Sequence, residues 1–65
     1  MVTVYYWRYA VERAEETDTV EEAVRFLAYG NDRGELASSR IVDGDRTIEG
    51  AELDGLVAEA YRHLR

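Results

Sequence analysis

The chain has 65 residues and no cysteine, so it has room for one small domain and lacks the disulfides or zinc–thiolate sites that often stabilise such domains. Its residues are 46% apolar and include five Tyr, one Trp and one Phe, which is enough for a hydrophobic core and argues against disorder. The formal net charge of −6 opposes binding to the phosphates of nucleic acids. No run approaches the length of a membrane span and no secretory signal is present, so we expect a cytoplasmic protein that does not bind membranes.

The first segment, residues 2–10, is rich in β-branched and aromatic residues and contains no Gly or Pro. This composition predicts a β-strand. Alternation would place three apolar side chains on one face of that strand, namely Val2, Val4 and Tyr6. The other face would carry Thr3, Tyr5, Trp7 and Tyr9. Because both faces are apolar or aromatic, the strand is expected at the centre of a sheet.

An acidic segment follows, and residues 12–18 show no useful hydrophobic period, so we predict a loop there. Thr19 and Glu22 then match the Ser/Thr-x-x-Glu capping box, which predicts a helix that begins at Val20. The apolar residues that follow recur at helical spacing as far as Leu27. Gly30 is expected to end the helix in a left-handed conformation.

The second half of the chain predicts a hairpin and a helix. The turn sequence Asp43-Gly44-Asp45 should join strands at about 36–42 and 46–49. A second helix should follow Glu49 or Gly50, with an apolar stripe made of Leu53, Leu56, Val57, Ala60 and Leu64. The resulting order β-α-β-β-α predicts one α+β domain over residues 1–65. Its sheet would be three-stranded and mainly antiparallel, with both helices on one face.

The aromatic face of the first strand has three interpretations. It could be a second core closed by the acidic loop, an interface with a protein partner or a second copy, or a platform on which nucleic-acid bases stack. Base stacking needs cationic surroundings, which an acidic domain does not provide. We therefore expect a non-enzymatic protein-interaction module, which could form a homodimer and whose acidic segment steers a basic partner. The expected partner-binding residues are Tyr5, Trp7, Tyr9, Glu12, Glu15, Glu16 and Asp18.

An alternative function is the binding of a small ligand or nucleotide in a pocket between the sheet and the acidic loop. Tyr6, Arg8 and Arg40 would then hold an anionic group. This alternative requires those three side chains to lie close together.

The remaining candidate sites have simpler interpretations. Residues 43–49 superficially suggest a calcium loop but lack the third acid at the required spacing. His63 is expected at the end of the second helix, where a positive charge is favourable. Ser38 and Ser39 have no nucleophile elbow around them and no evident base nearby in sequence. We therefore expect no catalytic residue, no bound metal and no cofactor.

Four segments resemble the small uncharacterised proteins of actinobacteria and their bacteriophages. They are residues 4–9 (Val-Tyr-Tyr-Trp-Arg-Tyr), 19–26 (Thr-Val-Glu-Glu-Ala-Val-Arg-Phe), 34–35 (Gly-Glu) and 41–44 (Ile-Val-Asp-Gly). The resemblance spans most of the chain and implies an accessory role through protein binding, such as host takeover or counter-defence. It carries over no catalytic residues.

Overall fold

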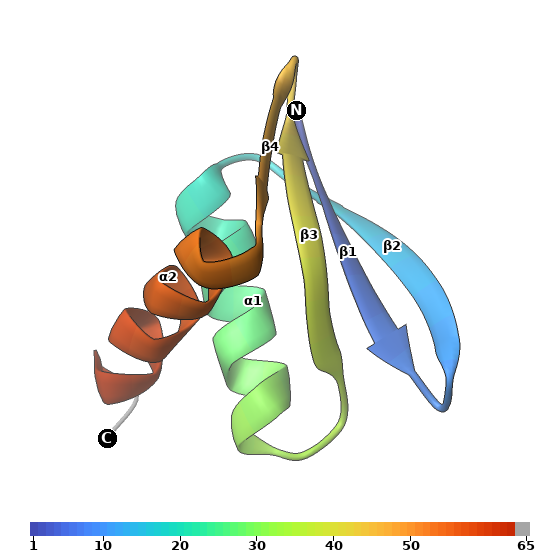
Figure 1. The fold of residues 1–65 in the computed structure, drawn as a ribbon, viewed down its shortest axis with the longest axis vertical. Helices are drawn as coiled ribbons and strands as arrows, with labels where there is room; N and C mark the ends of the chain where they lie inside the picture. Colours follow the sequence, from blue (N-terminus) through green and yellow to red (C-terminus); the bar gives the residue numbers. More distant parts are fainter. Residues whose placement is uncertain (64–65) are drawn as a thin grey trace.

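The computed structural model describes residues 1–63, which form one four-stranded antiparallel sheet and two helices. In chain order the elements are β1 (Val2–Arg8), β2 (Val11–Thr17), α1 (Val20–Asp32), β3 (Ala37–Asp43), β4 (Arg46–Glu49) and α2 (Gly50–His63). The strand order across the sheet is β2-β1-β3-β4, and both helices lie on the same side of it (Figure 1). The α+β class is confirmed, but the sheet has four strands where three were predicted.

The additional strand is β2, so the prediction of a loop over residues 12–18 was wrong. β1 ends at Arg8, and the chain reverses through Tyr9 and Ala10, whose φ angles are 53° and 64°. A two-residue turn with positive φ at both positions is the type I′ hairpin turn, whose twist matches that of antiparallel strands. β2 lies at the edge of the sheet with mostly exposed side chains, so it folds without the apolar alternation of a buried strand.

The core lies between the helices and one face of the sheet. On β1 it contains Val2, Val4 and Tyr6, the three residues that alternation places on one face. They pack in a single cluster with residues of both helices and of the β3–β4 hairpin, namely Ala23, Val24, Leu27, Ile41, Ile48 and Leu53. The helices therefore cover the Val2–Val4–Tyr6 face of β1, and the face that carries Tyr5 and Trp7 is left open.

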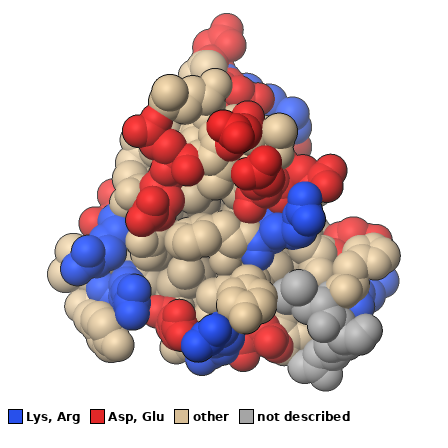
Figure 2. Space-filling view, turned by 180° about the vertical axis from the view of Figure 1, so that it is seen from behind, with Lys and Arg blue, Asp and Glu red and all other residues tan. Residues whose placement is uncertain are grey.

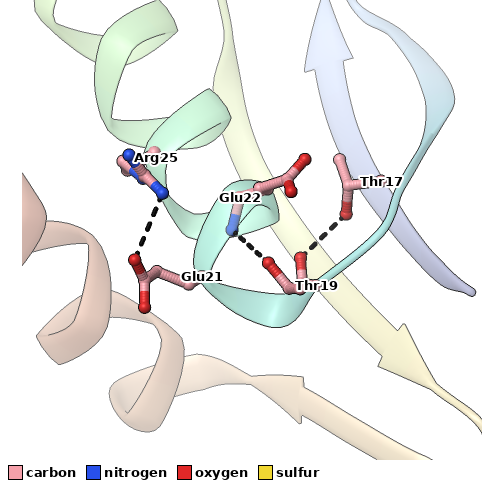
Figure 3. Close-up of polar contacts among 5 residues, drawn as sticks. All are labelled: Thr17, Thr19, Glu21, Glu22 and Arg25. Carbon is pink, nitrogen blue, oxygen red and sulfur yellow. Dashed lines mark hydrogen bonds and ion pairs between the residues drawn. The ribbon is translucent and has the colours of Figure 1, made fainter.

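The start of α1 agrees with the capping prediction. The Thr19 hydroxyl oxygen accepts a hydrogen bond of 3.1 Å from the backbone N–H of Glu22, and the helix begins at Val20. The Thr17 hydroxyl donates to the backbone carbonyl of Thr19 at 3.0 Å and ties the end of β2 to the cap (Figure 3). One N–H group of the first helical turn is thus satisfied by a side chain.

The predicted end of α1 was wrong, because Gly30 lies inside the helix. The left-handed residue is Gly34, with φ 71°. The backbone N–H of Glu35 donates to the Gly30 carbonyl at 2.9 Å, and the N–H of Gly34 donates to the Asn31 carbonyl at 3.0 Å. These two bonds form a Schellman motif, in which a glycine past the helix end satisfies the last carbonyls.

The second half of the chain agrees with the prediction more closely. β3 and β4 flank a two-residue turn with Gly44 at its first position and φ 63°, and Asp43 pairs with Arg46. α2 follows with Leu53 buried, Val57 and Ala60 half-buried and Leu56 37% exposed, whereas Leu64 lies outside the described residues. Neither helix within residues 1–63 is long and apolar enough to cross a membrane.

Candidate functional site

The sheet has one open face, the one opposite the helices. Strand alternation and the pairing register place eleven side chains on it. They are Thr3, Tyr5 and Trp7 of β1, Glu12, Ala14 and Glu16 of β2, Ala37, Arg40 and Val42 of β3, and Thr47 and Glu49 of β4. The solvated face of an antiparallel sheet is usually polar. Here Tyr5 and Trp7 make the middle strand of the face aromatic, and charged side chains of the neighbouring strands surround them.

Four side chains form a connected cluster at the centre of the open face, which we call the Tyr5 cluster: Tyr5, Arg40, Glu12 and Ser39. The Arg40 guanidinium lies 4.0 Å from the centroid of the Tyr5 ring, within the range of a cation–π contact. Nη1 of Arg40 is 3.0 Å from Oε2 of Glu12. Since β2 and β3 lie on opposite sides of β1, this ion pair crosses β1 and joins three strands.

A β-bulge helps to build the Tyr5 cluster. Tyr5 pairs with Arg40 and Tyr6 with Ser38, so Ser39 is an extra residue in β3. The Ser39 hydroxyl donates to Oε2 of Glu12 at 3.0 Å. Bulges re-aim side chains in this way. The Glu12 carboxylate therefore receives two hydrogen bonds from β3 and is held in one place.

The predicted aromatic surface is only partly formed. Tyr5 and Trp7 lie on the open face, half-buried and 45% exposed respectively. Tyr9 does not share their face, because β1 ends at Arg8 and Tyr9 lies in the turn, where it is 85% exposed. The Arg8 guanidinium lies 5.5 Å from the centroid of the Tyr9 ring.

The predicted acidic surface is divided between two faces. Glu12 and Glu16 lie on the open face, opposite Trp7 and Thr3 of β1. Glu15 pairs with Val4 and therefore lies on the helix side, and Asp18 lies in the bend before α1. The acidic residues do not form one continuous patch, because a strand alternates its side chains between two faces.

A groove of about 810 Å³ lies on the helix side, between the β1–β2 hairpin and α1. It is lined by Tyr6, Arg8, Glu15, Thr17, Glu22, Arg25, Phe26, Tyr29, Gly30, Glu35 and Leu36. The rings of Tyr6 and Phe26 meet edge-to-face there, with centroids 5.2 Å apart. The space-filling view from behind shows acidic side chains gathered above an uncharged surface and arginines lower down at its margins (Figure 2).

The three residues of the alternative ligand site are not brought together. Tyr6 and Arg8 line the groove, whereas Arg40 lies on the open face with the sheet between them. The prediction placed a loop where β2 lies. With residues 11–17 in the sheet, no loop folds over to join the two surfaces.

Polar side chains elsewhere in residues 1–63 make local contacts. The Ser38 hydroxyl accepts from the Asn31 amide at 3.1 Å, and His63 Nε2 is 3.5 Å from Oε1 of Glu59. The hydrogen bond with the Tyr29 hydroxyl, together with the charge of Glu35, raises the pKa of Arg33. Within the described residues, no group of three His, Cys, Asp or Glu could hold a metal ion, and no buried side-chain polar atom lacks a hydrogen-bond partner.

No protein-family model, curated protein or solved structure matches the chain. The geometry of the open face and of the groove is therefore what indicates a function. Sequence reasoning missed Ser39, Ala14 and Val42 on the open face, and Phe26, Tyr29 and Leu36 in the groove. The hairpin register was the signal that would have found the first set, because it fixes which residues of β2 and β3 flank Tyr5 and Trp7.

Proposed function

We propose that this domain is a non-enzymatic protein-interaction module whose open sheet face binds a basic protein surface. The observation that carries the proposal is the exposed Trp7 beside the Tyr5–Arg40 stack on a sheet face that no helix covers. Trp, Tyr and Arg are the residue types that contribute most to binding energy in protein interfaces. Their side chains here come from strands, which are rigid elements suited to an interface.

Charge supports a basic partner. On the open face the Arg40 cation is already paired with Glu12. Glu16 and Glu49 make no ion pair with any described residue, so the margins of this face carry unneutralised negative charge. A partner with cations around an apolar centre would complement this pattern and would be steered by it. The same charges disfavour a nucleic-acid backbone.

The test is capture of cellular proteins on the immobilised domain, with a matched pair of variants. Trp7→Ala removes the exposed ring on the open face, whereas Tyr29→Ala removes a similarly exposed ring on α1, away from that face. We expect the wild-type domain to capture a basic partner. The Trp7→Ala variant should bind that partner at least about tenfold more weakly than the wild type, as for loss of an interface hot spot, and the Tyr29→Ala variant should bind it as the wild type does. A partner that tolerates Trp7→Ala, or one that is acidic, would contradict the proposal.

A second candidate function is the binding of a small anionic ligand in the groove. Arg8 lines it and makes no ion pair with a described residue, and the Tyr6–Phe26 pair provides an aromatic wall. Arg40 takes no part in this version of the site. Thermal-shift screening with nucleotides and aromatic carboxylates would test it, because a ligand of the folded state raises the melting temperature. The shift should disappear in Arg8→Gln, and a shift that persists would exclude this site.

A further inference from the structure

The outer edge of β2 is available for strand pairing. β2 is seven residues long and pairs only with β1, in an unbroken register from Val2–Thr17 to Arg8–Val11. Proteins usually protect such edges with short strands, proline, bulges or charge. The chain has no proline and the β1–β2 pairing has no bulge, so charge is the device used here. The pattern of that charge then decides which strand can pair.

The hairpin geometry indicates which amides of β2 point outward. In a two-residue hairpin the pair that flanks the turn, here Arg8–Val11, is hydrogen-bonded, and bonded pairs alternate with non-bonded pairs along the ladder. The amides of Arg13 and Glu15 are then directed to β1. Those of Glu12, Ala14 and Glu16 are directed away from the sheet, where another strand could receive them.

We propose that β2 pairs antiparallel with β2 of a second copy of this chain, about a twofold axis through Ala14. A twofold axis perpendicular to the sheet leaves each side chain on the same face of the sheet. Because neighbouring residues of a strand face opposite sides, the axis must pass between two copies of the same residue. Between Glu12 and Glu16, Ala14 is the only residue without a charge, so an axis at any other of these positions places a charged side chain opposite its own copy. The axis through Ala14 places Arg13 opposite Glu15 of the second copy, and Glu15 opposite its Arg13.

These two cross-strand pairs are favourable for geometric reasons. Arg13 and Glu15 are exposed, lie on the same face of β2 and make no ion pair with a described residue of their own chain. With Ala14 as a hydrogen-bonded pair, the Arg13–Glu15 pairs are non-hydrogen-bonded, and side chains lie closest in pairs of that kind. Because the dimer is twofold symmetric, the Arg13–Glu15 contact occurs twice.

Two symmetry-related contacts oppose the pairing. On the open face the same register places Glu12 opposite Glu16 of the second copy, and Glu16 opposite its Glu12. The cost is reduced because Arg40 and Ser39 already hold the Glu12 carboxylate, each at 3.0 Å. The net charge of −6 on each copy also repels at long range, so self-association is best measured at about 0.15 M salt, where the Debye length is about 8 Å.

The resulting dimer would have one continuous eight-stranded sheet, twice the four strands of one copy. A perpendicular axis keeps both helical layers on one side and both open faces on the other. The dimer would therefore present two copies of the Trp7 surface side by side. This inference does not depend on the proposed function, because the pairing is carried by the β2 backbone with Arg13 and Glu15, whereas the proposed function is carried by Trp7 and the Tyr5–Arg40 stack.

Sedimentation equilibrium of charge-swap variants tests the pairing. Arg13→Glu and Glu15→Arg each replace two attractive contacts with two repulsive ones, so each should weaken self-association by about tenfold or more. The double variant should restore it. An equimolar mixture of the two single variants should form heterodimers, because both contacts are then again between opposite charges.

Two controls separate pairing at the β2 edge from a general effect of net charge and from association through another surface. Arg46→Glu on β4 changes the net charge as Arg13→Glu does but lies at the opposite edge, and it should leave the dimer intact. Ala14→Pro removes the outward N–H at the axis and should give a folded monomer.

The proposal is overturned by a wild-type chain that stays monomeric at about 1 mM, by a dimer that Arg13→Glu does not weaken, or by a double variant without recovery. Loss of the dimer in Trp7→Ala with no effect of Arg13→Glu would assign self-association to the open face instead.

Discussion

Leu36 lies directly against the backbone of Gly30, so close that a Cβ atom at position 30 would come within 2.5 Å of Leu36 Cγ. We predict that Gly30→Ala lowers the free energy of unfolding. Overpacking costs about 1–3 kcal/mol, and the gain of about 1 kcal/mol in helix propensity offsets only part of it. Denaturation in urea would measure the change.

Gly55 is the matched control, because it is also inside a helix but nothing lies within 4 Å of a Cβ placed there. Gly55→Ala should raise the free energy of unfolding by up to about 1 kcal/mol. In a Leu36→Ala background, Gly30→Ala should no longer destabilise. Equal effects of the two glycine substitutions would show that the contact with Leu36 has no energetic role.

The turn between β1 and β2 provides a stabilising substitution. Ala10 has φ 64°, and a left-handed conformation costs a non-glycine residue about 1–2 kcal/mol. Ala10→Gly should therefore raise the free energy of unfolding by about 1 kcal/mol. The control is Ala58→Gly on the exposed side of α2, which should lower it by about the same amount. If both substitutions destabilise, the turn does not carry the strain assigned to it.

The cap of α1 can be tested with a conservative pair. Thr19→Ala removes the oxygen that accepts from the N–H of Glu22 and should cost about 1 kcal/mol of stability. Thr19→Ser keeps that oxygen and should cost little. Thermal denaturation followed by circular dichroism would compare the two variants. Equal melting temperatures for Ala and Ser at this position would mean that the hydrogen bond contributes nothing.

The elements that the sequence predicted well are those in which several signals agree. The start of α1 had both a cap residue and a helical apolar period, and the β3–β4 turn had Asp-Gly after a segment that alternates weakly. β2 had neither kind of signal. Its turn, Tyr9-Ala10, contains none of the residues that favour positive φ, and an edge strand with exposed faces needs no apolar pattern. An exposed charged strand and a charged loop therefore have the same composition.

The candidate site was predictable only in part for the same reason. Alternation alone placed Tyr5 and Trp7 on one face, and the structure agrees. The contribution of Glu12 and Ser39 depends on the β2 register and on a bulge, which are non-local properties of the sheet. Arg40 was predicted to bind a ligand together with Tyr6 and Arg8, but the strand register places Arg40 on the face of the sheet opposite to Tyr6 and Arg8.

The Arg40–Tyr5 contact should contribute to stability beyond what a surface ion pair provides. A cation–π contact at an exposed site is worth about 0.5–1 kcal/mol, and the ion pair with Glu12 about 0.2–1 kcal/mol. In a double-mutant cycle, Arg40→Met and Tyr5→Leu should show a coupling energy of about 0.5–1 kcal/mol that persists at about 1 M salt.

The ion pair of Arg46 with Glu52, also 3.0 Å long but without a ring beneath it, is the control. Its coupling energy, measured with Arg46→Met and Glu52→Gln, should fall towards zero at that salt concentration because both groups are exposed. A Tyr5–Arg40 coupling that is screened to the same extent would mean that the ring contributes nothing and that Arg40 is held by Glu12 alone.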